Sequence, residues 1–122
     1  MIVGIGTDII EIERVNRSLK LEHFIKRVFT PREIEYCNSR GRQKAASYAA
    51  RFAGKEAFFK ALGTGIIFSL NCVEILNDEL GQPHVNLKST SNEIVKNLDM
   101  SKVHISLSHS KYYATATCII EI

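Results

Sequence analysis

The sequence predicts an α+β fold in which an antiparallel-rich sheet packs against one long helix and several short helices. Short segments rich in β-branched residues, near both ends of the chain, are typical of strands. A single alanine-rich segment over residues 43–62 predicts the long helix. No repeat or low-complexity linker divides the 122 residues, so one domain is expected over residues 1–122.

The first strand is predicted over residues 2–10, where isoleucine and valine dominate. Because side chains alternate along a strand, one face carries Val3, Ile5, Thr7 and Ile9, and the other carries Gly4, Gly6, Asp8 and Ile10. Asp8 therefore follows two glycines on its own face. Glycines at these positions leave room for another backbone or for a ligand.

Short helices are expected between residues 11 and 41. One begins at Glu11 and a second surrounds Phe24, as the apolar spacing indicates. A third begins at Thr30-Pro31-Arg32-Glu33, where threonine caps the helix, proline fits the first turn and glutamate closes a capping box. This helix is expected to end near residues 38–41, which resemble a loop.

The long helix is followed by Gly63 and Gly65, which are typical of helix ends. The remaining elements are strands at 72–77 and 84–88, a short helix at 92–98, and strands at 103–109 and 112–122. The last strand is largely apolar on both faces and is expected to be covered on both. The second cover could be the long helix or another subunit.

Composition narrows the functional class. The net charge of +3 is mild and no basic run is concentrated, so binding to nucleic acid is not expected. The apolar N-terminus is too short to span a bilayer and is interrupted by acidic residues, so neither membrane insertion nor a signal peptide is expected. Three widely spaced cysteines predict reduced thiols in a cytoplasmic protein.

Glu56 is unusual because it lies on a semi-apolar side of the long helix, between Phe52 and Phe59. An ionised carboxylate there is unfavourable unless it is paired. Lys60 could supply an ordinary helix ion pair of ~0.3–0.5 kcal/mol. A metal ion is the alternative, and Asp8 could share it, since Mg²⁺ takes one or two carboxylates together with water and phosphate oxygens. Taken alone, Asp8 could instead accept hydrogen bonds from backbone amides at a strand end.

Basic residues accompany Glu56 on the long helix. Arg51, Lys55 and Lys60 could hold a polyphosphate beside a metal ion, or they could form a solvated basic face. The glycines after the helix do not form a Walker pattern. His109 closes the strand at 103–109 in phase with apolar residues, so it could be a hydrogen-bonded residue at the core edge or a catalyst.

Three segments occur together in an order that resembles one enzyme family. They are GIGTDIIEIERV, RFAGKEAFFKALGTG and SLSHSKYYATA, with GQP in the central turn. Over essentially its whole length the chain resembles the holo-[acyl-carrier-protein] synthases, the short bacterial class of 4′-phosphopantetheinyl transferases. The resemblance implies that family's fold and its reaction. The reaction transfers 4′-phosphopantetheine from coenzyme A to a serine of apo acyl carrier protein and releases adenosine 3′,5′-bisphosphate.

The resemblance also implies roles for single residues. Asp8 and Glu56 would bind Mg²⁺ and act in catalysis together with Lys60. The serine proton could pass to Glu56 or to a metal-held water, and the sequence does not decide between them. Coenzyme A would be bound by Arg51, Lys55, Lys60, Gly65 and His109. The acidic carrier protein would be met by Arg14 and Arg27. The family is typically a homotrimer with each active site between two subunits.

Two positions depart from the family pattern. Gly54 stands where alanine or another small residue is more common, which indicates either close packing or tolerance of glycine. His23 stands where relatives offer arginine to the carrier protein.

Two other functions are compatible with the residues alone. One is another Mg²⁺-dependent phosphotransferase or pyrophosphatase, acting on coenzyme A or a nucleotide. The other is a basic binding module in which Asp8 and Glu56 are structural.

Overall fold

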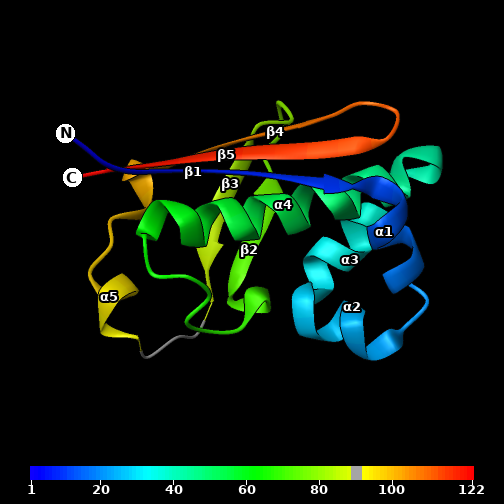
Figure 1. Ribbon diagram of the computed structural model, residues 1–122, viewed down its shortest axis with the longest axis horizontal. Coiled ribbons are helices and arrows are strands. Elements are labelled where there is room, and N and C mark those ends of the chain that lie inside the picture. Colours follow the sequence, from blue (N-terminus) through cyan, green and yellow to red (C-terminus); the bar gives the residue numbers. More distant parts are fainter. Residues whose placement is uncertain (89–91) are drawn as a thin grey trace.

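The computed structural model describes residues 1–88 and 92–122, and it confirms the α+β class. A three-stranded antiparallel sheet has the order β1-β5-β4 and consists of β1 (Ile2–Glu11), β5 (Tyr113–Glu121) and β4 (Val103–His109). A separate hairpin pairs β2 (Val73–Asn77) with β3 (Pro83–Leu87). The long helix α4 (Lys44–Leu62) runs along the larger sheet, and the hairpin crosses behind it (Figure 1).

The short helices gather at the two ends of α4 (Figure 1). At one end lie α1 (Ile12–Ser18), α2 (Glu22–Val28) and α3 (Pro31–Asn38), and at the other lies α5 (Glu93–Lys96). Single 3₁₀ turns occur at Gly41–Gln43, Leu70–Cys72 and Met100–Lys102. No helix in the described ranges is both long enough and apolar enough to cross a membrane.

The capping box predicted at the start of α3 is confirmed. The amide of Glu33 donates to the hydroxyl of Thr30 at 3.2 Å, and the amide of Thr30 donates to the Glu33 carboxylate at 2.9 Å. Both residues are buried. This helix start is therefore part of the protein interior, and its carboxylate needs a partner there.

The larger sheet has one covered face and one open face. Along β5, the buried side chains that face α4 are Ala114, Ala116, Cys118 and Ile120. On the opposite face, Val3, Ile5 and Ile9 of β1 are 52%, 66% and 63% exposed. The helix thus supplies one of the two covers expected for the last strand. The other face has no cover within the described part of the chain.

The contact between β1 and α4 depends on two glycines. A Cβ atom added at Gly6 would lie 2.0 Å from the carbonyl oxygen of Ala57, and one added at Gly4 would lie 1.9 Å from that of Ala61. The space beside these glycines is therefore filled by helix backbone, which was one of the two predicted alternatives. As a result, β1 lies directly on α4 and carries Asp8 to the surface of the helix.

Gly54 marks close packing. An added Cβ there would lie 2.5 Å from Ile75 Cδ1 and 3.1 Å from Ile105 Cδ1. Both atoms are ends of flexible side chains, which can move more easily than backbone. Alanine at this position would also gain about 1 kcal/mol of helix propensity.

We expect Gly6→Ala to lower the free energy of unfolding by about 2–3 kcal/mol, because the new methyl group overlaps helix backbone that cannot rotate away. Urea unfolding followed by circular dichroism measures the change. Gly54→Ala serves as the control, and a much smaller loss is expected since side-chain ends can yield there. A Gly6→Ala protein as stable as the parent would contradict this account of the contact.

Candidate active site

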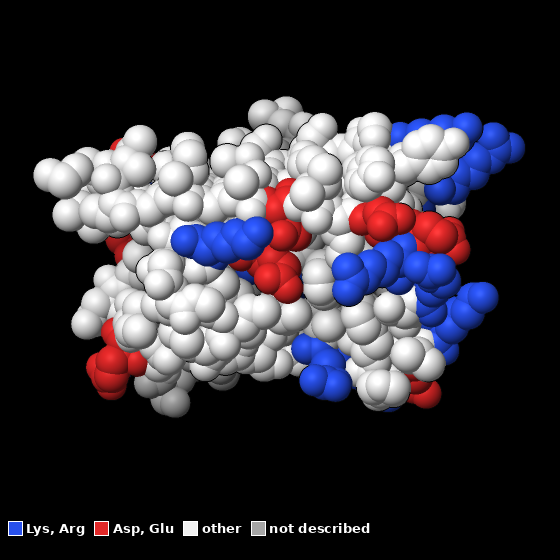
Figure 2. Space-filling model, viewed as in Figure 1, with Lys and Arg blue, Asp and Glu red and all other residues white. Residues whose placement is uncertain are grey.

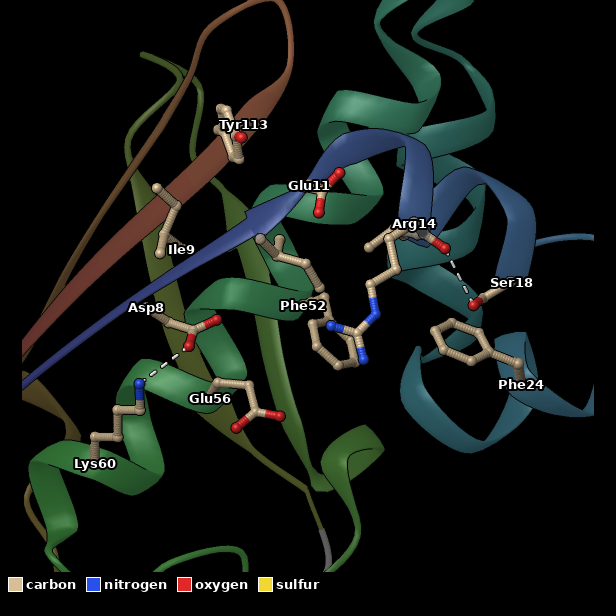
Figure 3. A pocket seen from close by; sticks show the side chains of 12 residues that line it. Asp8, Ile9, Glu11, Arg14, Ser18, Phe24, Phe52, Glu56, Lys60 and Tyr113 are labelled. Atoms are coloured by element: carbon tan, nitrogen blue, oxygen red, sulfur yellow. Dashed lines mark hydrogen bonds and ion pairs between the residues drawn. The ribbon is translucent and has the colours of Figure 1, made fainter.

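A pocket of about 540 Å³ opens where β1 meets α4 and α1. Asp8 enters it from β1, Glu56 and Lys60 from α4, and Arg14 from α1 (Figure 3). Its apolar side chains include Val15, Phe24, Phe52 and Tyr113. The fold thus brings together two carboxylates that are far apart in the sequence, with a basic residue on either side of them.

Lys60 pairs with Asp8 rather than with Glu56. Its ammonium donates to Asp8 Oδ1 at 3.1 Å and to the carbonyl oxygen of Thr7 at 2.9 Å. The helix ion pair between Glu56 and Lys60, which was the ordinary alternative for Glu56, is therefore not formed. The reason is the close approach of β1, which offers Lys60 two acceptors on the strand.

Glu56 has no hydrogen bond or ion pair to any described residue. Burial raises the pKa of Glu56, and the charge of Asp8 raises it further, while Lys60 acts in the opposite direction. The pocket thus holds a half-buried carboxylate whose negative charge is disfavoured. A cation bound next to it would remove this penalty.

The two carboxylates fit a hard divalent cation. Magnesium binds carboxylate oxygens and completes its shell with water and phosphate oxygens, so two protein ligands suffice. No group of three or more His, Cys, Asp or Glu side chains suited to a metal occurs in the described ranges. The donor set at Asp8 and Glu56 therefore matches an ion that takes most of its ligands from a substrate and solvent.

The charge pattern on this face of the molecule agrees with the arrangement of charged side chains in the pocket (Figure 3). Figure 2 shows acidic atoms in the middle of the face and basic side chains on both sides of them. A ligand that carries several negative charges would meet cations around the acidic centre, while a divalent cation would bind at the centre itself.

Lys55, expected to bind coenzyme A, does not line this pocket, and its ammonium is directed into the protein interior. Its side chain is 0% exposed, and its ammonium donates to Glu33 Oε1 at 2.7 Å and to the carbonyl oxygens of Val73 at 2.6 Å and Leu70 at 3.2 Å. The three protons of the ammonium are thus all used inside the protein. Lys55 is the partner that the buried carboxylate of the α3 capping box requires.

Arg51 is also directed into the protein, so α4 does not present the expected face of three basic residues. It is 3% exposed, donates to Ser47 Oγ at 3.1 Å and to Asn77 Oδ1, and lies over the ring of Tyr36 at 4.4 Å. Arg51 and Lys55 are four residues apart and share one side of the helix. Glu56 lies on the side that borders the pocket. Of the three basic residues Arg51, Lys55 and Lys60, only Lys60 lines the pocket.

His109 lies outside this pocket, in a second one of about 440 Å³. Its Nε2 is 3.0 Å from Gln43 Oε1, and its ring is exposed, so it is not a core residue. Arg42 and Lys111 line the same pocket, which the sequence did not indicate. Both lie in turns, where sequence periodicity says nothing about which side chains meet.

Two further predicted residues also lie elsewhere. Gly65 is exposed in the segment after α4, with φ of 70°. Arg27 lines a groove beside α2 that also includes His23 and the half-exposed Leu21 and Ile66. The described structure therefore brings Asp8, Glu56, Lys60 and Arg14 together, and leaves the other predicted residues outside their pocket.

Residues 4–118 match the 4′-phosphopantetheinyl transferase superfamily. The holo-[acyl-carrier-protein] synthase of Fusobacterium nucleatum is 45% identical over 122 residues, which cover 98% of this chain and 99% of the relative. That of Clostridium botulinum strain Eklund 17B is 48% identical over 126 residues, covering 100% of this chain and 99% of the relative.

Solved structures with the same fold include two holo-[acyl-carrier-protein] synthases. The enzyme of Neisseria meningitidis is 33% identical, with a TM-score of 0.87 and full coverage of both chains. That of Bacillus anthracis, in complex with CoA (3′,5′-ADP), is 37% identical, with a TM-score of 0.82, and the match covers 99% of this chain and 97% of that one. Since sequence and fold both match along almost the entire length, the chain belongs to the 4′-phosphopantetheinyl transferase superfamily and, within it, to the holo-[acyl-carrier-protein] synthases.

Proposed function

We propose that this protein transfers 4′-phosphopantetheine from coenzyme A to a serine hydroxyl of apo acyl carrier protein, with Mg²⁺ as the cofactor. The observation that carries the proposal is the pocket in which Asp8, Glu56 and Lys60 meet, in a chain of this family. The cysteine pattern favours the cytoplasm as the place of the reaction.

The shape and charge of the pocket suit this substrate. Its volume lies within the range of about 300–1,000 Å³ that is usual for ligand sites. Asp8, Glu56 and Lys60 make one side ionic, as a cation and a diphosphate require. On the other side the rings of Phe24 and Phe52 lie beside the guanidinium of Arg14, and their apolar surface can accommodate the uncharged pantetheine arm.

In the proposed reaction the serine oxygen forms a bond to the β-phosphorus of coenzyme A, and the bond from that phosphorus to the bridging oxygen breaks. The serine proton is lost, and adenosine 3′,5′-bisphosphate leaves with the electron pair. Lys60 would place a positive charge beside the diphosphate. Asp8 and Glu56 would hold the Mg²⁺, which supplies further positive charge to the diphosphate oxygens. Glu56 or water in the pocket would accept the serine proton.

A single assay separates this function from its alternatives. The purified protein is mixed with coenzyme A, Mg²⁺ and apo carrier protein, and the carrier protein is weighed by mass spectrometry. We expect it to gain the mass of phosphopantetheine, and we expect a chelator to prevent the gain. Release of the bisphosphate without a change in the carrier protein would indicate a hydrolase. Carrier binding without any reaction would indicate a binding module.

We also propose that the protein acts as a homotrimer with its active sites between subunits. The open face of the large sheet presents Ile5, Ile9 and Tyr113, and the last two also line the pocket. A second subunit packed on this face would therefore adjoin the pocket. Residues outside the pocket, such as His109, could then reach the coenzyme A bound by a neighbour.

We expect Ile5→Lys to convert the assembly into monomers, because it places a charge in the proposed interface. Light scattering coupled to size exclusion measures the mass. Ile94→Lys is the matched control, since Ile94 is 56% exposed on α5, away from the sheet. A mass unchanged by Ile5→Lys would count against this interface.

Arg14 and Arg27 are proposed to meet the acidic carrier protein, and both are exposed. We expect Arg14→Glu to weaken carrier binding about tenfold or more, since reversing a charge opposes an acidic partner. Calorimetry with carrier protein and with coenzyme A compares the two affinities. Arg17→Glu, on the same helix but outside the pocket lining, is the control. Equal losses for both ligands would contradict a docking role.

A further inference from the structure

We propose that Lys60 is an internal counter-ion of Asp8 that the divalent cation must displace. The cation would then bind tightly only when the diphosphate of coenzyme A offers Lys60 a new partner. This inference rests on the proposed function, because it assumes a cation at Asp8 and Glu56. It adds a coupling between two ligands that the chain itself would impose.

The contacts of Lys60 show how the site is held without ligands. Its ammonium is 3.1 Å from Asp8 Oδ1 and 2.9 Å from the carbonyl oxygen of Thr7. The Asp8 side chain is only 16% exposed, whereas that of Lys60 is 53% exposed. The carboxylate is therefore held in place by the fold, while the lysine can swing away on its flexible four-carbon stem.

An ammonium and a divalent cation compete for this carboxylate. A cation that binds alone must break the ion pair, and it then experiences repulsion from the ammonium a few ångströms away. Glu56 does not hold the ammonium away from Asp8, because Lys60 forms its ion pair with Asp8 and none with Glu56. Glu56 is the open ligand of the site, and Asp8 is the ligand whose charge is already neutralised.

A diphosphate removes the competition by giving the ammonium another acceptor. Phosphate oxygens form strong charge-assisted hydrogen bonds with lysine. Once Lys60 moves to the diphosphate, Asp8 is available to the cation. The affinity of each ligand must then rise by the same factor when the other is present, because binding free energies are reciprocal.

The direct test measures Mn²⁺ binding by electron paramagnetic resonance without coenzyme A. We expect Lys60→Gln to bind Mn²⁺ about three- to tenfold more tightly than the parent, the range of a partly exposed ion pair plus the lost repulsion. Arg17→Gln is the matched control. It removes a positive charge from α1, and Arg17 lies in the last turn of that helix, outside the pocket lining. We expect it to change Mn²⁺ affinity about twofold or less.

A second measurement repeats the titration with saturating coenzyme A. We expect coenzyme A to increase the Mn²⁺ affinity of the parent by a larger factor than that of Lys60→Gln, since the variant has no counter-ion to remove. If Lys60→Gln binds Mn²⁺ alone no more tightly than Arg17→Gln, the counter-ion role is overturned, and the transferase proposal is unaffected. If no protein binds Mn²⁺ with or without coenzyme A, the metal site fails, and the counter-ion role fails with it.

Discussion

Replacing Glu56 by glutamine is expected to slow phosphopantetheine transfer about a thousandfold. Glutamine keeps the size of the side chain but removes one of the two negative charges that would hold the cation. A metal that supplies several kcal/mol of transition-state stabilisation corresponds to about three powers of ten in rate. The rate of mass gain by the carrier protein measures the effect. Asp8→Asn is expected to act in the same way.

The glutamine variant is expected to remain folded and to gain stability at pH 7. The pKa of Glu56 is raised above 4.5 in the folded protein, so ionisation of Glu56 opposes folding at neutral pH. This penalty is fully present above the raised pKa and vanishes below about pH 4.5. Thermal unfolding of metal-free protein should therefore show a higher midpoint for Glu56→Gln at pH 7 and no difference in acid.

Glu13→Gln is the control for the rate, because Glu13 is an exposed acid on α1 outside the pocket lining. Its rate should equal that of the parent. A Glu56→Gln protein that transfers phosphopantetheine at the parent's rate would contradict the assignment of Glu56 as a metal ligand.

Lys55→Met is expected to lower the free energy of unfolding by about 3–5 kcal/mol, because it leaves a buried carboxylate without its cation. Glu33 is 0% exposed, and Lys55 is its only ion-pair partner among the described residues. The carbonyl groups of Leu70 and Val73 lose a donor as well. Urea unfolding measures the loss.

A second substitution separates the ion pair from other causes. Lys55→Met combined with Glu33→Gln is expected to recover part of the stability, since no buried charge is then unpaired. A Lys55→Met protein with the parent's stability but weak coenzyme A binding would give the opposite result. It would support the role in ligand binding that the family resemblance implied.

The fold could be predicted where short-range patterns decide the structure. The alternation along β1 separated the open face from the face on α4, and the capping box at Thr30 identified the start of α3. In both cases the pattern spans only a few residues. The order of the strands in the larger sheet depends on contacts between distant segments, which a local pattern does not contain.

The site could be predicted only in part for the same reason. Asp8 and Glu56 stood out because each carboxylate interrupts an apolar segment. Arg51 and Lys55 were expected on a basic face of the long helix but are buried, and this difference has a clear cause. Helix α4 is buried around most of its circumference, so its alanine-rich sequence does not show which side meets the solvent. The partner of Lys55 is Glu33. The capping box already accounted for Glu33 in the sequence, so nothing there indicated that Glu33 also pairs with a buried lysine.

The glycine contact between β1 and α4 has a consequence for how this enzyme can vary. At Gly4 and Gly6, the strand that bears Asp8 lies directly against main-chain atoms of the helix that bears Glu56. Changes of neighbouring core residues during evolution should therefore leave the relative positions of Asp8 and Glu56 unchanged. Any residue larger than glycine at position 4 or 6 would push β1 away from α4 and so separate Asp8 from Glu56. These two positions should therefore tolerate less variation than the core around them.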